Sequence, residues 1–129
     1  MFGIEMKDYR NFEAYKISKR LSALIYFYTL TWPREQIFGL TSQVQRAAVS
    51  VLSNLAEGCG RVASKDTCHF LAISRGSCYE VEAQIDLACE LGYLTPEQYH
   101  ELQYLVDQIK RLLNGLYKRY ENLGAKTVK

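Results

Sequence analysis

The sequence predicts an all-α protein, an up-down-up-down antiparallel four-helix bundle that forms a single domain over residues 1–129. Apolar residues recur at alternating spacings of three and four in four long segments, which places them along one seam of a helix. Short connections join these segments, so consecutive helices are expected to pack antiparallel. The chain of 129 residues has only 2 prolines, which disfavours a turn-rich β domain.

The first long helix is expected from about Arg10 to Thr31. Its apolar seam consists of Ala14, Ile17, Leu21, Leu24 and Tyr28. Trp32 ends this helix, because a residue that precedes proline disfavours the α conformation. Pro33 then suits the first turn of a short helical segment that ends near Gly39.

The two middle helices are expected from Leu40 to Gly58 and from Ser64 to Leu91. The seam of the first is Val44, Ala48, Val51 and Leu55, and the seam of the second is Leu71, Ser74, Cys78, Val81, Ile85 and Ala88. Glycines at the end of the first can take the left-handed conformation of a helix cap. Ser64 is a residue type that caps a helix N-terminus.

The fourth helix begins with the sharpest local pattern in the chain, Thr95-Pro96-Glu97-Gln98. Thr95 and Gln98 are spaced to form a capping box, and Pro96 suits the first helical position. The seam continues through Leu102, Val106, Ile109, Leu113, Leu116 and Tyr120. The ordered core is therefore expected over about residues 9–121, with frayed termini.

Composition limits the class of protein further. With 48% apolar and 23% charged residues, the chain can build one core but not two. No apolar run reaches about 18 residues, so no membrane-spanning helix is expected. Charged residues within the first ten positions disfavour a signal peptide, so we expect a cytoplasmic protein. Its four cysteines lack C-x-x-C spacing and are expected to be free, buried thiols (Cys59, Cys68, Cys78 and Cys89).

Several apolar residues lie beside the seams or off them. They are Tyr26, Phe27, Phe70, Tyr79, Tyr104, Leu105, Leu112 and Tyr117. These residues either widen the core-facing stripe of each helix or form a second apolar face that a partner subunit covers. The presence of 10 tyrosines favours the second interpretation, because tyrosine is enriched at interfaces.

Polar residues interrupt the two middle helices at Arg46, Asn54, Glu57, Glu80 and Glu82. In an antiparallel hairpin with its turn near Gly58, Arg46 lies level with Glu80, and we expect a dry cross-helix ion pair. This network is interpreted as structural, fixing helix register or a subunit interface. Acid–base catalysis by the paired carboxylates is the weaker alternative, because no histidine accompanies them.

A metal site is not expected. A carboxylate-bridged di-iron bundle needs two Glu-x-x-His pairs, and only Glu97 and His100 have that pattern. Asp66 and His69 form the other acid-x-x-His pair, and the topology puts it at the opposite end of the bundle.

The helix from residue 40 to 58 reads LTSQVQRAAVSVLSNLAEG. Five further blocks accompany it: residues 12–15, 75–77, 80–82, 90–94 and 113–116. In these residues the chain resembles, over about residues 9–120, the four-helix-bundle proteins encoded in intervening sequences of bacterial large-subunit ribosomal RNA genes. One departure is Leu52, which stands where that family often has proline.

The resemblance implies a relationship to the accessory variability determinant protein of diversity-generating retroelements. It implies a ring-shaped homopentamer, with no enzymatic activity and no cofactor. We therefore expect a homo-oligomer, and we expect no contact with a membrane.

Charge is distributed unevenly along the chain. The net charge is +3 over residues 1–56, −6 over residues 57–109 and +5 over residues 110–129. Folded as a bundle, the chain should be basic at one end and acidic at the other, and a ring would add the basic ends into one rim. The expected nucleic-acid contacts are Arg61, Lys65, Lys118 and Arg119, with Lys16 and Arg20 beside them.

Two functions remain open at this point. The first is a non-enzymatic, ring-like scaffold that binds RNA or DNA without sequence specificity, since no base-reading motif is present. The alternative is a protein–protein interaction module that docks a partner enzyme such as a polymerase or reverse transcriptase.

Overall fold

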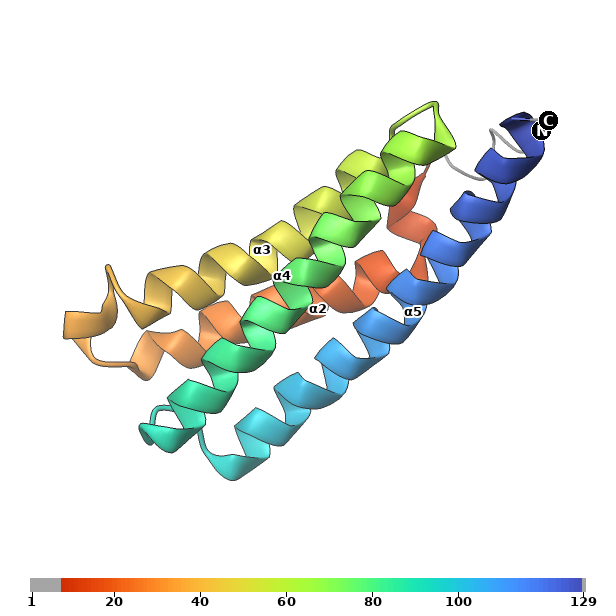
Figure 1. The fold of residues 1–129 in the computed structure, drawn as a ribbon. Coiled ribbons are helices and arrows are strands. Elements are labelled where there is room, and N and C mark those ends of the chain that lie inside the picture. The colour runs from red at the N-terminus through yellow and green to blue at the C-terminus, as the bar shows by residue number, and fades with distance from the viewer. Residues whose placement is uncertain (1–7, 129) are drawn as a thin grey trace.

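Four long helices build the protein, as the sequence predicts. The computed structural model describes the backbone of residues 8–128 and the side chains of residues 8–125. The helices are α2 (Glu13–Tyr28), α3 (Leu40–Cys59), α4 (Ser64–Glu90) and α5 (Pro96–Val128), and the described residues contain no strand. Three short 3-10 turns accompany them: η1 (Tyr9–Asn11), η2 (Thr29–Thr31) and η3 (Arg34–Gln36). Figure 1 shows successive helices running in opposite directions, which makes the fold an up-down-up-down bundle.

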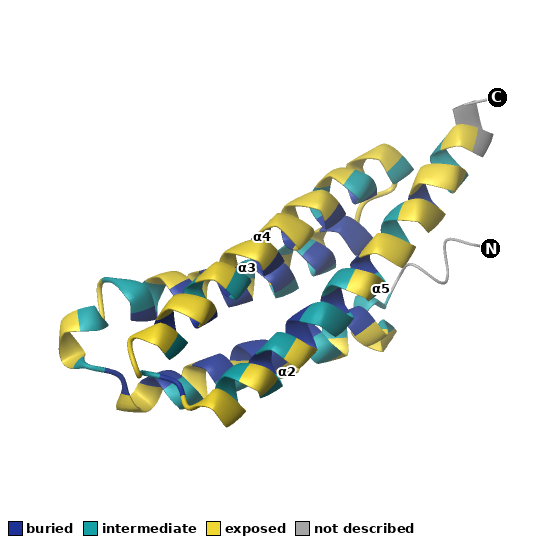
Figure 2. Cartoon of the chain, turned by 60° about the horizontal axis from the view of Figure 1, so that its bottom comes forward, coloured by how far each residue is buried: buried dark blue, intermediate teal, exposed yellow. Residues whose placement is uncertain are grey.

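Each helix packs against two neighbours. The packed pairs are α2/α3, α3/α4, α4/α5 and α5/α2, so the chain goes once around the bundle. Figure 2 shows the buried residues (dark blue) facing the interior and the exposed ones (yellow) facing outward. The predicted seams of α3 and α4 are buried at every position, and that of α5 at every position except half-buried Leu116.

The buried face of α2 differs from the predicted seam. Ile17 and Leu24 are only half-buried, whereas Ser18 and Ser22 are buried. The Ser18 hydroxyl donates to the Ala14 carbonyl at 2.7 Å, and the Ser22 hydroxyl donates to the Ala48 carbonyl on α3 at 3.2 Å. Because a backbone oxygen satisfies each hydroxyl, their burial costs little, and the apolar pattern alone misplaced this face.

The helix ends confirm one predicted cap and correct two others. The Thr95 hydroxyl accepts from the Gln98 amide at 3.1 Å, and the Gln98 side chain accepts from the Thr95 amide at 3.0 Å, which completes the capping box. Ser64 is the first helical residue and not the cap, which is Ala63. No left-handed glycine ends α3, because Gly60 has a φ of −84°.

The outer bounds of the first and last helices also differ from the prediction. Phe12 has an extended backbone, so η1 and α2 are separate, and η2 replaces the expected last turn. Helix α5 continues to Val128, past the expected end of the ordered core at about residue 121. The expected fraying of the N-terminus falls on residues 1–7, outside the described part of the chain.

Apolar residues off the seams have mixed positions. Tyr26, Phe27, Tyr79 and Tyr104 are exposed, whereas Leu105 is buried in the core. The remaining three, Phe70, Leu112 and Tyr117, are half-buried. Leu105 therefore widens the core-facing stripe, whereas the exposed tyrosines and Phe27 form an apolar surface on the single chain. Within the described residues, no helix is long and apolar enough to cross a membrane.

Candidate nucleic-acid interface

Three segments distant in sequence meet at one end of the bundle. The start of α2, the turn between α3 and α4, and the last third of α5 lie together there (Figure 1). This end carries the exposed cations Lys16, Arg61, Lys65, Lys118 and Arg119, and we call it the basic end. Five of the six residues predicted to contact nucleic acid are thus brought to one end, on three helices and a turn.

Arg20 is the sixth predicted residue, and it does not belong to the basic end. Its guanidinium lies 3.7 Å from the carboxylate of Glu101, near the start of α5 and so toward the opposite end of the bundle. Tyr28 also donates a hydrogen bond to Glu101, which raises the pKa of the tyrosine. Arg20 is therefore part of an α2/α5 contact, because its position midway along α2 lets it reach this carboxylate.

Arg61 already contacts two other side chains of the protein. It forms an ion pair with Glu57, one helical turn earlier, and its guanidinium lies 4.7 Å from the centre of the Phe70 ring. A cation over an aromatic ring is already partly satisfied. Arg61 is thus less available to a ligand than Lys65, for which no ion pair is found within the described residues.

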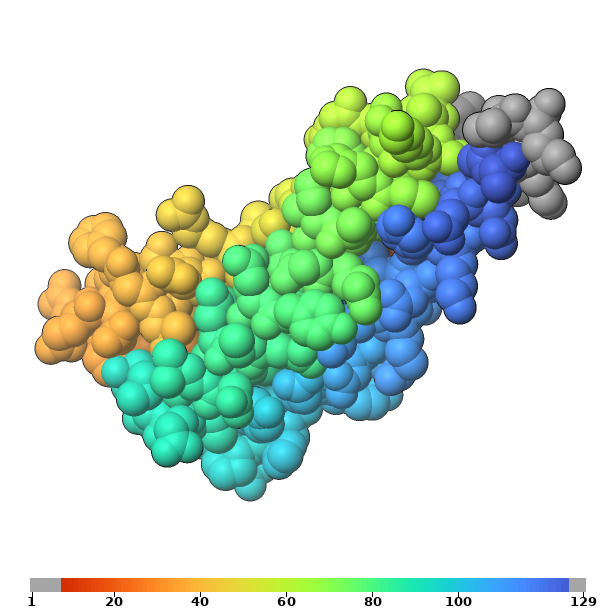
Figure 3. All heavy atoms as spheres, in the orientation of Figure 1, coloured from red at the N-terminus to blue at the C-terminus, as the bar shows by residue number. Residues whose placement is uncertain are grey.

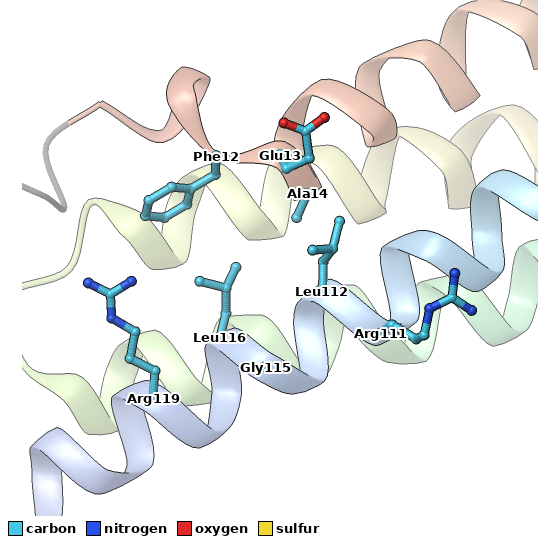
Figure 4. Close-up of a pocket in the computed structure, with 8 residues that line it drawn as sticks. All are labelled: Phe12, Glu13, Ala14, Arg111, Leu112, Gly115, Leu116 and Arg119. Atoms are coloured by element: carbon cyan, nitrogen blue, oxygen red, sulfur yellow. The ribbon is translucent and has the colours of Figure 1, made fainter.

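An apolar groove of about 310 Å³ runs between the start of α2 and residues 111–119 of α5. Its lining residues are Phe12, Glu13, Ala14, Arg111, Leu112, Gly115, Leu116 and Arg119. Figure 4 shows Arg119 rising from α5 toward the Phe12 ring, with Arg111 at the other end of the groove. The groove therefore combines an apolar floor with a guanidinium group at each end.

The sequence-based prediction missed Arg111 and Phe12 as parts of this site. Helical spacing could have found Arg111, because residues 111, 115 and 119 follow one another at i+4 and share a face of α5. Nothing local could have found Phe12, whose position depends on how α2 meets α5.

A second groove, of about 430 Å³, lies on the other flank of α5, against the start of α4. Lys65 and His69 line it from α4, and Tyr117 and Glu121 line it from α5. The opposite end of the bundle carries exposed Asp86, Glu90 and Glu97. The acidic end is therefore as the sequence predicts, whereas the basic end also exposes the carboxylates of Glu13, Glu57, Asp66 and Glu121 among its cations.

The predicted pair of Arg46 and Glu80 takes a different form. The two residues lie across a groove of about 540 Å³ between α3 and α4, so the predicted register is right. Both side chains are exposed, however, and no ion pair joins them. The prediction of a dry pair is wrong, because both residues lie on the outer flank of the hairpin and not between its helices.

The other predicted polar residues form separate contacts. Glu82 faces α5, where its carboxylate accepts hydrogen bonds from Lys110 at 2.7 Å and from Gln103 at 2.6 Å. Burial lowers the pKa of Lys110, but the hydrogen bond and charge of Glu82 outweigh burial and leave that pKa raised. Asn54 donates to the Ser50 carbonyl at 2.9 Å. The contacts of Glu82 therefore join α4 to α5, whereas the contact of Asn54 lies within α3.

The four cysteines are free, as predicted, but only two are buried. Burial raises the pKa of Cys59 to about 11 and that of Cys78 to about 12, which makes both thiols unreactive near neutral pH. Cys68 and Cys89 are half-buried. Among the described residues, no group of three or more His, Cys, Asp or Glu side chains could hold a metal ion.

Comparison with known proteins adds the family. A family model described as 23S rRNA-intervening sequence protein matches residues 10–115. The chain is also similar to the crystal structure of a protein with unknown function from the S23 ribosomal protein family of Bacteroides thetaiotaomicron. That match has 22% sequence identity and a TM-score of 0.74, and it covers 81% of this chain and 98% of the other. No curated protein matches the chain.

Proposed function

The chain belongs to the family of 23S rRNA-intervening sequence proteins, and we propose that it is a non-enzymatic, ring-like scaffold that binds nucleic acid without sequence specificity. We propose further that the ring is a homopentamer, acts in the cytoplasm and needs no cofactor. The observation that carries the proposal is the basic end, where exposed cations of α2, α4 and α5 lie on segments that meet at one end of the bundle (Figure 1).

The arrangement of these cations supports binding to phosphates. Lys16, Lys65, Arg111 and Lys118 are exposed, and none of them forms an ion pair within the described residues. Their counterions are solvent ions, which a polyanion can release on binding. The acidic side chains at the other end would keep a nucleic acid to one side of the molecule.

An exposed apolar cluster supports assembly into an oligomer. It consists of Phe27, Leu30, Ile37 and Phe38, at the end opposite the basic end. Phe38 is 97% exposed and Leu30 is 77% exposed, which is unusual for large apolar side chains. Figure 3 shows the segment around η3 and the start of α3 (orange) protruding from the body of the molecule. A second copy of the chain that packs here would remove these side chains from water.

The same cluster favours the alternative function, a module that docks a partner enzyme such as a polymerase or reverse transcriptase. The two proposals differ in the mass of the purified protein. We expect light scattering to give about five times the chain mass of 14.9 kDa, and a Phe38→Asp variant to give a smaller species. A wild-type protein of 14.9 kDa at micromolar concentration would contradict the ring and favour the partner module.

Binding to RNA of unrelated sequences at several salt concentrations tests the nucleic-acid proposal. A variant with Lys16, Lys65, Arg111 and Lys118 changed to Gln should bind every sequence more weakly. Each lost phosphate contact should reduce the log–log salt slope by about 0.7 for a single strand. A wild-type protein that binds no RNA at low salt would contradict the proposal.

A matched control changes Asp86 to Asn and Glu90 and Glu97 to Gln, at the acidic end. Glu101 stays unchanged, because it contacts Tyr28 and Arg20. This variant should bind RNA as well as the wild type or slightly more tightly. An equal loss of RNA affinity in both variants would mean that binding does not depend on the basic end.

A further inference from the structure

We propose that the groove between α2 and α5 seats one unpaired base of single-stranded RNA, while the arginines at its two ends contact the flanking phosphates. This inference rests on the proposed nucleic-acid binding, and it adds a located pocket and a preference for unpaired strands. It concerns the groove lined by Phe12, Leu112, Gly115 and Leu116, which we call the α2/α5 slot.

The volume and the lining of the slot suit a single base. Its volume of about 310 Å³ lies at the lower end of the range for small-molecule pockets, roughly 300–1,000 Å³. Leucines form the apolar floor, and the Phe12 ring stands at one side (Figure 4). A methyl group built on Gly115 would meet no atom within 4 Å, so the floor is open at that position.

The charges around the slot suit a strand that runs along α5. Arg111 and Arg119 are eight residues apart, which is roughly 12 Å along the helix axis. Guanidinium groups at this separation can contact phosphates on both sides of a seated base. Glu13 also lines the slot, but in Figure 4 its carboxylate points away from α5 and does not face an incoming phosphate.

The combination of a ring and a guanidinium favours a base over an acidic peptide. Proteins that bind single strands stack bases on aromatic rings, and the Phe12 ring provides such a surface at one side of the slot. In a duplex, the base is already stacked and paired and cannot enter. The slot therefore discriminates by strandedness and not by sequence.

Filling the slot without changing any charge tests the inference. Gly115→Leu places a side chain in the slot, and the open space at this position lets the helix keep its fold. Gly76→Leu is the matched control, because Gly76 also lies within a helix, on α4, with no atom within 4 Å of an added methyl group. Circular dichroism and thermal melting of both variants verify that they fold.

Two RNA probes of equal length and charge separate base binding from phosphate binding. One is oligouridylate, and the other is the same ribose-phosphate chain without bases. The wild type and Gly76→Leu should bind oligouridylate about 5-fold to 150-fold more tightly than the abasic chain. Gly115→Leu should bind both probes with the affinity that the wild type has for the abasic chain.

Several outcomes would overturn the inference. Equal binding of the two probes by the wild type, or an unchanged preference in Gly115→Leu, would show that no base enters the slot. Tighter binding of a matched single-stranded DNA, or displacement of RNA from the slot by an acidic amphipathic peptide, would reject RNA as the occupant. The proposed function fails separately, and only if the wild type binds neither RNA probe at low salt.

Discussion

The α3/α4 pair and the α2/α5 pair are both antiparallel helix pairs in one bundle, but they close in different ways. Between α3 and α4, buried hydroxyls meet backbone oxygens: Ser74 donates to the Val51 carbonyl at 2.7 Å, and Thr67 donates to the Gly58 carbonyl at 2.9 Å. Between the start of α2 and residues 111–119 of α5, Phe12 and Leu116 border an apolar groove that stays open.

The difference follows from the size of the side chains at each contact. A methyl group on Gly58 would lie only 3.0 Å from the Phe70 β-carbon and 3.2 Å from the Thr67 carbonyl oxygen, so a side chain there would have to push α3 and α4 apart. A methyl group on Gly115 of α5 would meet no atom of another helix within 4 Å, so the missing side chain leaves space and does not bring a neighbour closer. Glycine thus brings the two helices together near Gly58 and leaves space beside the helix at Gly115, in the groove between α2 and α5.

Alkaline pH should have the largest effect on stability. It acts on the α3/α4 pair, which carries the buried thiols of Cys59 and Cys78. Burial raises the pKa of Cys78 from its ordinary value of 9.0 to about 12, so above pH 9 the unfolded chain loses this proton before the folded one does. Stability should therefore fall as the pH rises from about 9 to about 12, by about 4 kcal/mol for this group.

Urea unfolding at pH 8, 9.5 and 11 measures this effect. The free energy of unfolding of Cys78→Ala should fall less steeply with pH than that of the wild type, whatever the cost of the substitution itself. Parallel slopes for the two proteins would show that the Cys78 thiol ionises as easily in the folded chain as in the unfolded one.

Leucine at the two glycines should give opposite results. Gly58→Leu should destabilise the protein by about 3 kcal/mol, because the added side chain meets Phe70 and the Thr67 carbonyl. Gly115→Leu should leave stability unchanged or raise it by up to about 1 kcal/mol, because leucine favours the helix and finds open space. Chemical denaturation of both variants checks the pair, and equal losses would mean that the α2/α5 slot is as closed as the α3/α4 contact.

A smaller effect is expected from the hydroxyl between α3 and α4. Ser74→Ala removes the hydrogen bond to the Val51 carbonyl and should cost about 1 kcal/mol of unfolding free energy. Ser53→Ala, at an exposed position of α3, is the control and should change stability by less than about 0.5 kcal/mol. If both changes cost the same, the buried hydroxyl does not help to close this pair.

The smallest effect is expected at Arg46, on the outer flank of the same pair. Arg46→Ala should change the free energy of unfolding by less than about 0.5 kcal/mol, because the side chain is exposed and forms no ion pair with Glu80. A loss of 3 kcal/mol or more, measured by urea denaturation, would mean that Arg46 is buried against another subunit.

Most of the secondary structure could be predicted from the sequence, and so could the basic end, because helix periodicity, short connections and formal charge are local properties. The binding surface could be predicted only in part. Lys16, Lys65 and Lys118 lie where expected, whereas Arg20 turns to Glu101 and Arg61 turns to Glu57. An arginine side chain is long enough to reach either a ligand or a neighbouring carboxylate, and sequence alone does not tell which it contacts.

The sequence by itself determined the four helices, the capping box at Thr95 and the buried seams of α3 and α4, since each depends on residues within one or two turns. Only the tertiary structure decided which face of α2 is buried, that Glu82 pairs with Lys110 of α5, and that an open slot separates the start of α2 from residues 111–119 of α5. These features depend on the distance and rotation between helices, which side chains from both partners set jointly through packing.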